Sequence, residues 1–113
     1  MPPRELAALL EDILMAAAAI LEFTRNRTAA DYESDEMLRS AVERKFTIIG
    51  EALSNALGRD PTLRNRITEA RDIVDFRNVL VHGYSGIENG RVWLSIQRDL
   101  PRLLAEVRAM LSS

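Results

Sequence analysis

The sequence predicts an all-α protein, an antiparallel four-helix-type bundle whose last helix is kinked or broken. Apolar residues recur every three or four positions through four segments of the chain, which is the spacing of a buried helical stripe. No stretch shows the sustained period-two alternation of a half-buried strand. The chain has 113 residues, 47% of them hydrophobic. We therefore expect one domain, residues 1–113, with a core large enough to fold.

The first helix should begin after Pro2-Pro3 and run to about Arg25. The alanine run at 16–19 has high helix propensity and permits a neighbouring helix to approach closely. Its apolar stripe comprises Leu6, Leu9, Leu10, Ile13, Ala17, Ile20, Leu21 and Thr24.

Residues 26–33 are predicted to connect this helix to the next, with Ser34 or Asp35 as the N-cap. The second helix should run to about Leu57, with Gly58 as its stop. Gly50 lies in its middle, where glycine costs about 1 kcal/mol relative to alanine, so close backbone packing is expected there. The apolar side comprises Leu38, Ala41, Val42, Phe46, Ile49, Leu53 and Ala56.

Asp60-Pro61 has the N-cap and N1 arrangement of a short helix that ends near Arg66. A third long helix should follow and end at His82-Gly83, because glycine commonly terminates helices. Its inward residues are predicted to be Ile67, Ala70, Ile73, Val74, Leu80 and Val81.

A loop from Tyr84 to Gly90 should lead into the last helical region. Asp99-Leu100-Pro101 predicts a kink or a restart there, because proline cannot donate the helical hydrogen bond. The apolar residues of this region are Val92, Trp93, Leu94, Ile96, Leu100, Leu103, Leu104, Val107 and Leu111.

Composition excludes several classes of protein. The chain has no cysteine and one histidine, which leaves no disulfide framework and no cysteine or histidine cluster for zinc. We expect an intracellular protein that needs no transition metal and no cofactor. The longest apolar run, Ile13 to Leu21, is shorter than the roughly 20 residues of a membrane span, and the start lacks the pattern of a signal peptide. A soluble, cytoplasmic protein without membrane contact is the expectation.

Charge gives a weaker indication of partners. The net charge of −2 argues against a protein that coats nucleic acid non-specifically. Fourteen of the fifteen basic residues are nevertheless arginine, whose planar guanidinium suits phosphate recognition. Genome composition or simple ion pairing would give the same bias, and acidic residues alternate with the arginines between Arg59 and Arg77.

The stretch Arg77-Asn78-Val79-Leu80-Val81-His82-Gly83-Tyr84 carries the most distinctive polar chemistry. At about 100° per residue, Asn78 and His82 share a helix face, whereas Arg77 lies about 140° from His82. A histidine in the last helical turn faces the negative end of the macrodipole, which favours its protonated form and suits proton transfer. A capping or packing role for His82 is the simpler alternative.

Arg77-Asn78-x-x-x-His82-x-Tyr84 resembles the Arg-x4-His-x-Tyr signature of HEPN-type ribonuclease toxins, in the HepT-like branch that is paired with a minimal nucleotidyltransferase antitoxin. Ala41-Val42-Glu43-Arg44 and Ile48-Ile49-Gly50-Glu51-Ala52 are similar to its second-helix segment, and Trp93 with Asp99-Leu100-Pro101 is similar to its last helix. The expected tryptophan before the third helix is missing, and the stretch there is Arg64-Asn65-Arg66-Ile67.

This resemblance implies a HEPN-like homodimer in which paired motifs face one another across a cleft and cleave RNA, either tRNA or mRNA, without a metal. Two copies of His82 would act as base and acid, and two of Arg77 would clamp the phosphate. Asn78, on the His82 face, would orient the imidazole or hold the scissile phosphate, and an ordinary exposed helix residue is the alternative for it. Glu51 could pair with Arg77 across helices, which we interpret as structural.

The resemblance also implies that the nucleotidyltransferase antitoxin transfers AMP to Tyr84, which would add negative charge beside the cleft and repel RNA. A packed loop tyrosine is the alternative. Arg71, Arg44 and Lys45 are the candidates for further RNA contacts.

Two other classes of function remain open from the sequence. The chain could be a non-catalytic helical partner or substrate-binding protein of a nucleotidyltransferase, which would tolerate His82→Ala. It could also be a helical interaction module whose polar residues face no shared cleft.

Overall fold

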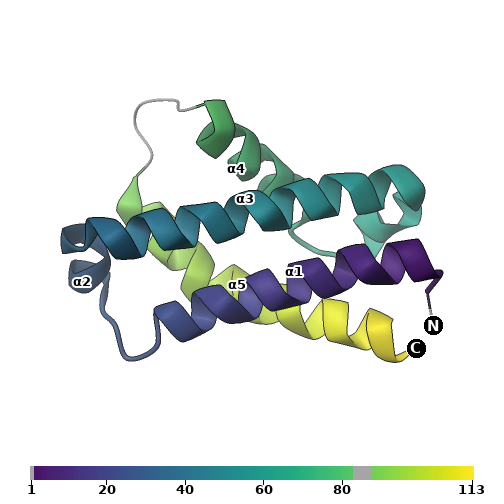
Figure 1. Ribbon diagram of the computed structural model, residues 1–113, viewed down its shortest axis with the longest axis horizontal. Coiled ribbons are helices and arrows are strands. Elements are labelled where there is room, and N and C mark those ends of the chain that lie inside the picture. Colours follow the sequence, from purple (N-terminus) through teal and green to yellow (C-terminus); the bar gives the residue numbers. More distant parts are fainter. Residues whose placement is uncertain (1, 83–87) are drawn as a thin grey trace.

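The computed structural model describes residues 2–82 and 88–113, with His82 placed only as the last residue of a helix. All regular structure in these ranges is helical, which confirms the predicted all-α class. The elements in Figure 1 are α1 (Arg4–Phe23), α2 (Ala29–Ser34), α3 (Glu36–Arg59), the 3-10 helix η1 (Pro61–Asn65), α4 (Ala70–His82) and α5 (Asn89–Ser112).

Helices α1 and α3 are the central pair, and they run antiparallel side by side (Figure 1). Helix α4 returns along α3, while α5 packs on α1 and on the short α2. Among the described residues, no Cα atom of α4 lies within 8 Å of a Cα atom of α5. The bundle is therefore open between α4 and α5, and α4 is supported mainly by α3.

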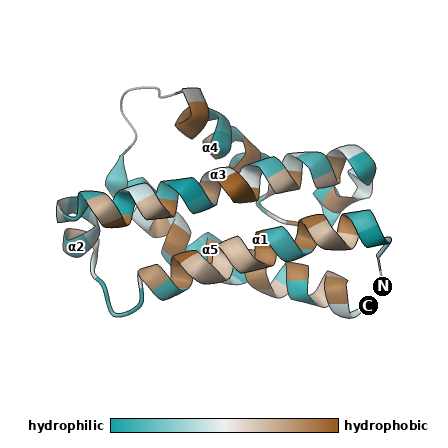
Figure 2. Cartoon of the chain, viewed as in Figure 1, coloured by the Kyte–Doolittle hydropathy of each residue, from teal (hydrophilic) through white to brown (hydrophobic). Residues whose placement is uncertain are grey.

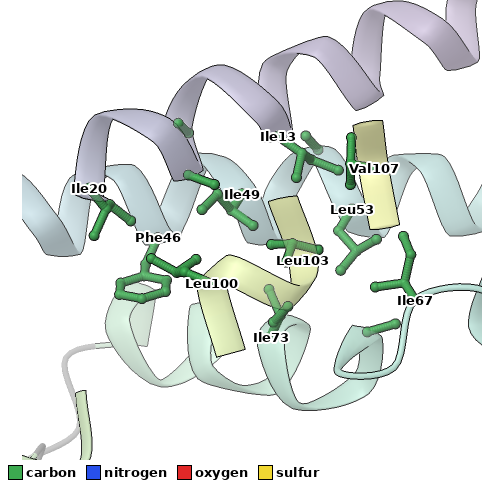
Figure 3. Packing of buried hydrophobic residues seen from close by; sticks show 14 of the residues in the cluster. Ile13, Ile20, Phe46, Ile49, Leu53, Ile67, Ile73, Leu100, Leu103 and Val107 are labelled. Carbon is green, nitrogen blue, oxygen red and sulfur yellow. The ribbon is translucent and has the colours of Figure 1, made fainter. Parts of the chain in front are cut away.

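Side chains from all four long helices nevertheless meet in one core (Figure 3). Ile13 of α1, Ile49 of α3 and Leu103 of α5 are almost completely buried there, and Ile73 of α4 closes the cluster from its side. The hydropathy colouring in Figure 2 shows apolar residues as stripes along the helices. In the described part of the chain, no helix combines the length and the apolarity that crossing a membrane requires.

The prediction that residues 26–33 only connect two helices is wrong, because α2 begins at Ala29. Thr28 and Asp31 form a capping box, in which each side chain accepts a hydrogen bond from the backbone N–H of the other residue. The buried Tyr32 packs against Trp93 with ring centroids 5.7 Å apart, which fixes α2 on α5. Asp35 caps α3 by accepting from the Leu38 N–H, as predicted.

Helix boundaries differ from the prediction at two other places. Gly58 does not stop α3, which continues to Arg59 and has Asp60 as its C-cap. The short helix that begins at Pro61 is confirmed as η1, with the Asp60 side chain accepting from the Thr62 N–H. Ile67 is buried as predicted, but it precedes the start of α4 at Ala70.

Helix α5 is assigned as one uninterrupted helix, with Pro101 inside it, so the last helix is not broken there. Proline leaves the carbonyl of Gln97 without its helical donor, and both residues are exposed, so water can satisfy that carbonyl. Val81, which was predicted to face inward, is 49% exposed, and Leu94, an apolar residue of the last helical region, is 54% exposed. Both stand on the two helices that diverge from each other, so neither has a neighbouring helix to cover it.

Candidate active site at the α3–α4 seam

Contacts with α5 fix the start of α4. The Thr68 hydroxyl donates to Glu106 at 2.7 Å, and the Thr68 backbone N–H faces the same carboxylate at 3.3 Å. Arg102 donates to Glu69 at 3.1 Å. Thr68 and Glu69 come just before the first residue of α4, so these contacts hold the N-terminal end of α4 against the C-terminal half of α5.

Gly50 fixes the middle of α4 against α3. A Cβ atom built on Gly50 would lie 2.1 Å from Cβ and 2.5 Å from Cγ of Arg77, far inside van der Waals contact. The aliphatic stem of Arg77 therefore fills the space that a side chain at position 50 would take. The sequence predicted close backbone packing at this glycine, and the atoms that approach it most closely are those of the side chain of Arg77, the candidate catalytic arginine.

The guanidinium of Arg77 is held at two of its nitrogens. Its Nη1 donates to Oδ1 of Asn78 at 2.8 Å, and its Nη2 lies 3.5 Å from Oε1 of Glu51. Its Nε is buried and has no hydrogen-bond partner in the part of the chain that the structure describes. The Arg77 side chain is 28% exposed, so part of this cation reaches the surface between α3 and α4.

On the helix surface, Arg77 and His82 are separated by about 140°, so helical spacing alone does not direct both side chains to one point. In the structure the Arg77 guanidinium reaches the His82 face, because it donates a hydrogen bond to the adjacent Asn78. His82 closes α4 four residues after Asn78, which is about one helical turn along the same face. The side chain of His82, and all of Gly83 and Tyr84, lie outside the described residues.

The other candidate residues are placed farther along the two helices. Arg71 is exposed near the start of α4, with Asp75 at 4.0 Å as a weak partner. Arg44 is exposed on α3 and Lys45 is half-buried there. Neither of these two forms a hydrogen bond or ion pair with Arg77 among the described residues. The structure thus joins Arg77 and Asn78 with Glu51, while Arg71, Arg44 and Lys45 stand apart from that cluster.

Chemically, the cluster presents hydrogen-bond donors suited to a phosphate. A guanidinium held by one amide and one carboxylate keeps its remaining N–H groups in a fixed direction, which favours charge-assisted bonds to phosphoryl oxygens. In the described part of the chain, no three histidine, aspartate or glutamate side chains are grouped so as to hold a metal ion.

An all-helical bundle with an Arg-Asn pair on the seam and a histidine at the end of the same helix is the arrangement of a HEPN-type protein. The family model described as Ribonuclease HepT-like matches residues 13–110. The chain belongs to the HepT-like ribonuclease family, and RNA cleavage is the activity that this membership supports.

Individual relatives agree with the family match. A protein of Methanocaldococcus jannaschii, provisionally named an RNase, is 34% identical over 107 residues, which cover 95% of this chain and 97% of the relative. A protein of Thermococcus cleftensis, provisionally named ribonuclease HepT, is 35% identical over 94 residues, 83% of this chain and 84% of the relative. No solved structure matches the chain.

Proposed function

We propose that this protein is the toxin of a toxin–antitoxin pair, a metal-independent endoribonuclease that cleaves tRNA or mRNA by attack of a ribose 2′-OH. The observation that carries the proposal is the seating of Arg77 on Gly50, with its guanidinium held between Asn78 and Glu51 one helical turn before His82. Family membership supports RNA as the substrate.

The proposed reaction needs one base and one acid. One His82 removes the proton of the 2′-OH, and the 2′ oxygen then forms a bond to the adjacent phosphorus. The bond from phosphorus to the 5′ oxygen breaks, and a second His82 protonates that leaving oxygen. The products are a 2′,3′-cyclic phosphate and a free 5′-OH. Arg77 stabilises the additional negative charge on the phosphoryl oxygens during this step.

A homodimer supplies the two imidazoles. The chain has one histidine, so one copy provides one proton-transfer imidazole where this reaction uses two. In a dimer with two-fold symmetry, identical surfaces meet, and two copies of the same motif can face one cleft. Asn78 then orients either the imidazole or the phosphate in each copy.

The exposed apolar surface near the site supports such a dimer. Phe76, Val79 and Leu80 on the last turns of α4 are only half-buried, and Val81 and Leu94 are exposed. A turn near the end of α4 accordingly appears brown in Figure 2. A second copy that covers these residues would bury apolar surface and bring two copies of α4 together.

A partner nucleotidyltransferase would control this activity through Tyr84. In the proposed modification, the phenol oxygen attacks the α-phosphate of ATP, a tyrosyl–AMP bond forms, and pyrophosphate leaves with the proton passing to a base or to water. The attached phosphate carries negative charge two residues after His82, where it would repel the RNA backbone.

The test is induction of this protein in a bacterial host, wild type beside His82→Ala and Arg77→Ala. We expect only the wild type to arrest growth and to produce RNA fragments that end in 2′,3′-cyclic phosphate. Purified wild type should keep its activity in EDTA, and a strict requirement for a divalent cation would refute metal independence. Retained cleavage by a folded His82→Ala protein would refute the catalytic role of His82. If the wild type does not cleave RNA either, although it and the two variants form soluble dimers, a non-catalytic partner of a nucleotidyltransferase becomes the better interpretation.

A further inference from the structure

Two grooves flank α4, one on each side. The first, which we name the α3–α4 groove, is lined by Ser54 and Leu57 of α3, Arg64 of η1, and Arg71, Val74 and Asp75 of α4. The second, the α4–α5 groove, occupies the opening where the backbones of these two helices diverge.

The two grooves differ in charge. Two arginines and one aspartate line the α3–α4 groove. Five carboxylates and only two arginines, Arg91 and Arg98, line the α4–α5 groove. Partial burial, together with the charges of Asp99 and Asp72, raises the pKa of Glu69 in the α4–α5 groove. Because RNA carries one negative charge per nucleotide, it is attracted to the first groove and repelled by the second.

The arginines of the α3–α4 groove are available to a ligand. The Arg71 side chain is 93% exposed, and its partner Asp75 is at the limit of ion-pair distance. Arg64 is exposed and forms no ion pair with a described residue. Leu57 of α3 and Val74 of α4 also line this groove, and they provide apolar surface against which a base or a ribose can pack.

The α3–α4 groove leads directly to the candidate active site. Ser54 lies three residues after Glu51 on α3, and Val74 lies four residues before Asn78 on α4. Each step is about one helical turn, or roughly 5.4 Å. The groove and the Arg77 cluster are thus consecutive parts of one seam between the same two helices.

We propose that the α3–α4 groove is a binding site for the single-stranded RNA that flanks the cleaved bond, with Arg71 and Arg64 contacting backbone phosphates. This inference rests on the proposed ribonuclease function and adds the path that the substrate takes across the protein. Arginine side chains contact phosphates, and apolar side chains such as Leu57 and Val74 pack on sugars or bases without reading them, so these residues contribute affinity rather than sequence preference.

The test measures binding and cleavage separately. Binding uses a fluorescent single-stranded oligonucleotide of twelve 2′-O-methyl nucleotides, which has no 2′-OH to react, titrated at several salt concentrations. The variants are Arg71→Gln and Arg64→Gln, and the matched controls are Arg4→Gln on α1 and Arg108→Gln on α5, which line neither groove. All four remove one positive charge from an exposed arginine. Cleavage is then measured on a long RNA and on a dinucleotide.

We expect Arg71→Gln and Arg64→Gln each to weaken binding severalfold and to lower the slope of log K against log salt by about 0.7. The KM for the long RNA should rise with kcat unchanged, and cleavage of the dinucleotide should not change, because a dinucleotide does not reach the groove. The proposal would be overturned if the control variants lost as much binding affinity, or if Arg71→Gln and Arg64→Gln kept the wild-type slope of log K against log salt. Failure of the wild type to cleave any RNA while these binding differences hold would instead refute the ribonuclease function and leave the groove as an RNA site.

Discussion

The stem of Arg77 occupies the space that a side chain at Gly50 would need, since a Cβ there would lie 2.1 Å from the Arg77 Cβ. The Arg77 Cβ is fixed by the backbone of α4, so rotating the arginine side chain cannot relieve this overlap. A residue larger than glycine at position 50 must therefore move α4 relative to α3. The position of the Arg77 guanidinium, the candidate catalytic cation, therefore depends on the absence of a side chain at Gly50 in α3.

Gly50→Ala should separate α3 from α4 at the candidate site. Overpacking a buried contact typically costs 1–3 kcal/mol, partly offset by about 1 kcal/mol of gained helix propensity. We expect a modest loss of unfolding free energy in urea and a large loss of RNA cleavage. Gly90→Ala is the matched control, because a Cβ at Gly90 meets nothing within 4 Å. Full activity in Gly50→Ala would show that the seat of Arg77 does not matter for catalysis.

Glu51→Gln should affect the rate of cleavage more than binding. Because the glutamine amide lacks the negative charge that holds Nη2, Arg77 becomes less well oriented, and we expect kcat to fall by about 10- to 100-fold. RNA should bind as tightly or more tightly, because a carboxylate is removed from beside the phosphate. Glu51 is half exposed, so the unfolding free energy should change by less than about 1 kcal/mol.

Measuring kcat and KM for Glu51→Gln and for a control variant, Glu22→Gln, would check whether Glu51 positions Arg77. Glu22→Gln removes a similar carboxylate, which lies 3.4 Å from Arg25 on exposed surface of α1, and it should leave kcat and KM unchanged. An increase in kcat for Glu51→Gln would show that Glu51 competes with the phosphate for Arg77 and does not position it.

Local patterns in the sequence predicted the long helices, since the spacing of apolar residues and the caps are properties of neighbouring positions. Asp35, Asp60 and the end of α4 at His82 were found in this way. The short α2 was missed because six residues carry no apolar stripe. Its only local signal was Thr28 followed three residues later by Asp31, a capping box with aspartate in the place of the usual glutamate.

Periodicity identifies the apolar face of a helix but not the element that covers it. Val81 and Leu94 belong to apolar stripes, yet they are exposed because α4 and α5 diverge. The candidate site shows the same limit. Residue spacing placed Asn78 on the face of His82, but the contact of Arg77 with Gly50 and Glu51 joins two helices, and only their packing in space reveals it.

Tyr32→Phe should stabilise the protein at neutral pH and remove an alkaline transition. The Tyr32 hydroxyl is buried and has no hydrogen-bond partner among the described residues, so deleting it should raise the unfolding free energy by on the order of 1 kcal/mol. Burial, followed by the charge of Glu43, raises the pKa of Tyr32 from 10.0 to about 12. The folded state therefore favours the neutral phenol. The contribution of this preference to the unfolding free energy is fully present below pH 10 and is lost as the pH rises towards 12.

Urea unfolding between pH 9 and 12 would measure this dependence. In wild type, the unfolding free energy should fall by about 1.4 kcal/mol for each pH unit in the window from 10 to 12, because the unfolded chain releases the proton first. The fall should be smaller in Tyr32→Phe. The same slope in both proteins would place the alkaline transition in another group.

Mixed dimers would show whether one cleft uses both copies of His82. Wild-type and His82→Ala chains, co-expressed with different tags, should form heterodimers that contain one imidazole. If the reaction needs two imidazoles, heterodimers are inactive, and activity falls with the square of the wild-type fraction, to about a quarter when half of the chains are wild type. If each copy acts alone, the fall is linear and half of the activity remains. Heterodimers isolated by sequential capture on both tags give the direct measurement: cleavage by them at half the wild-type rate would refute the shared cleft.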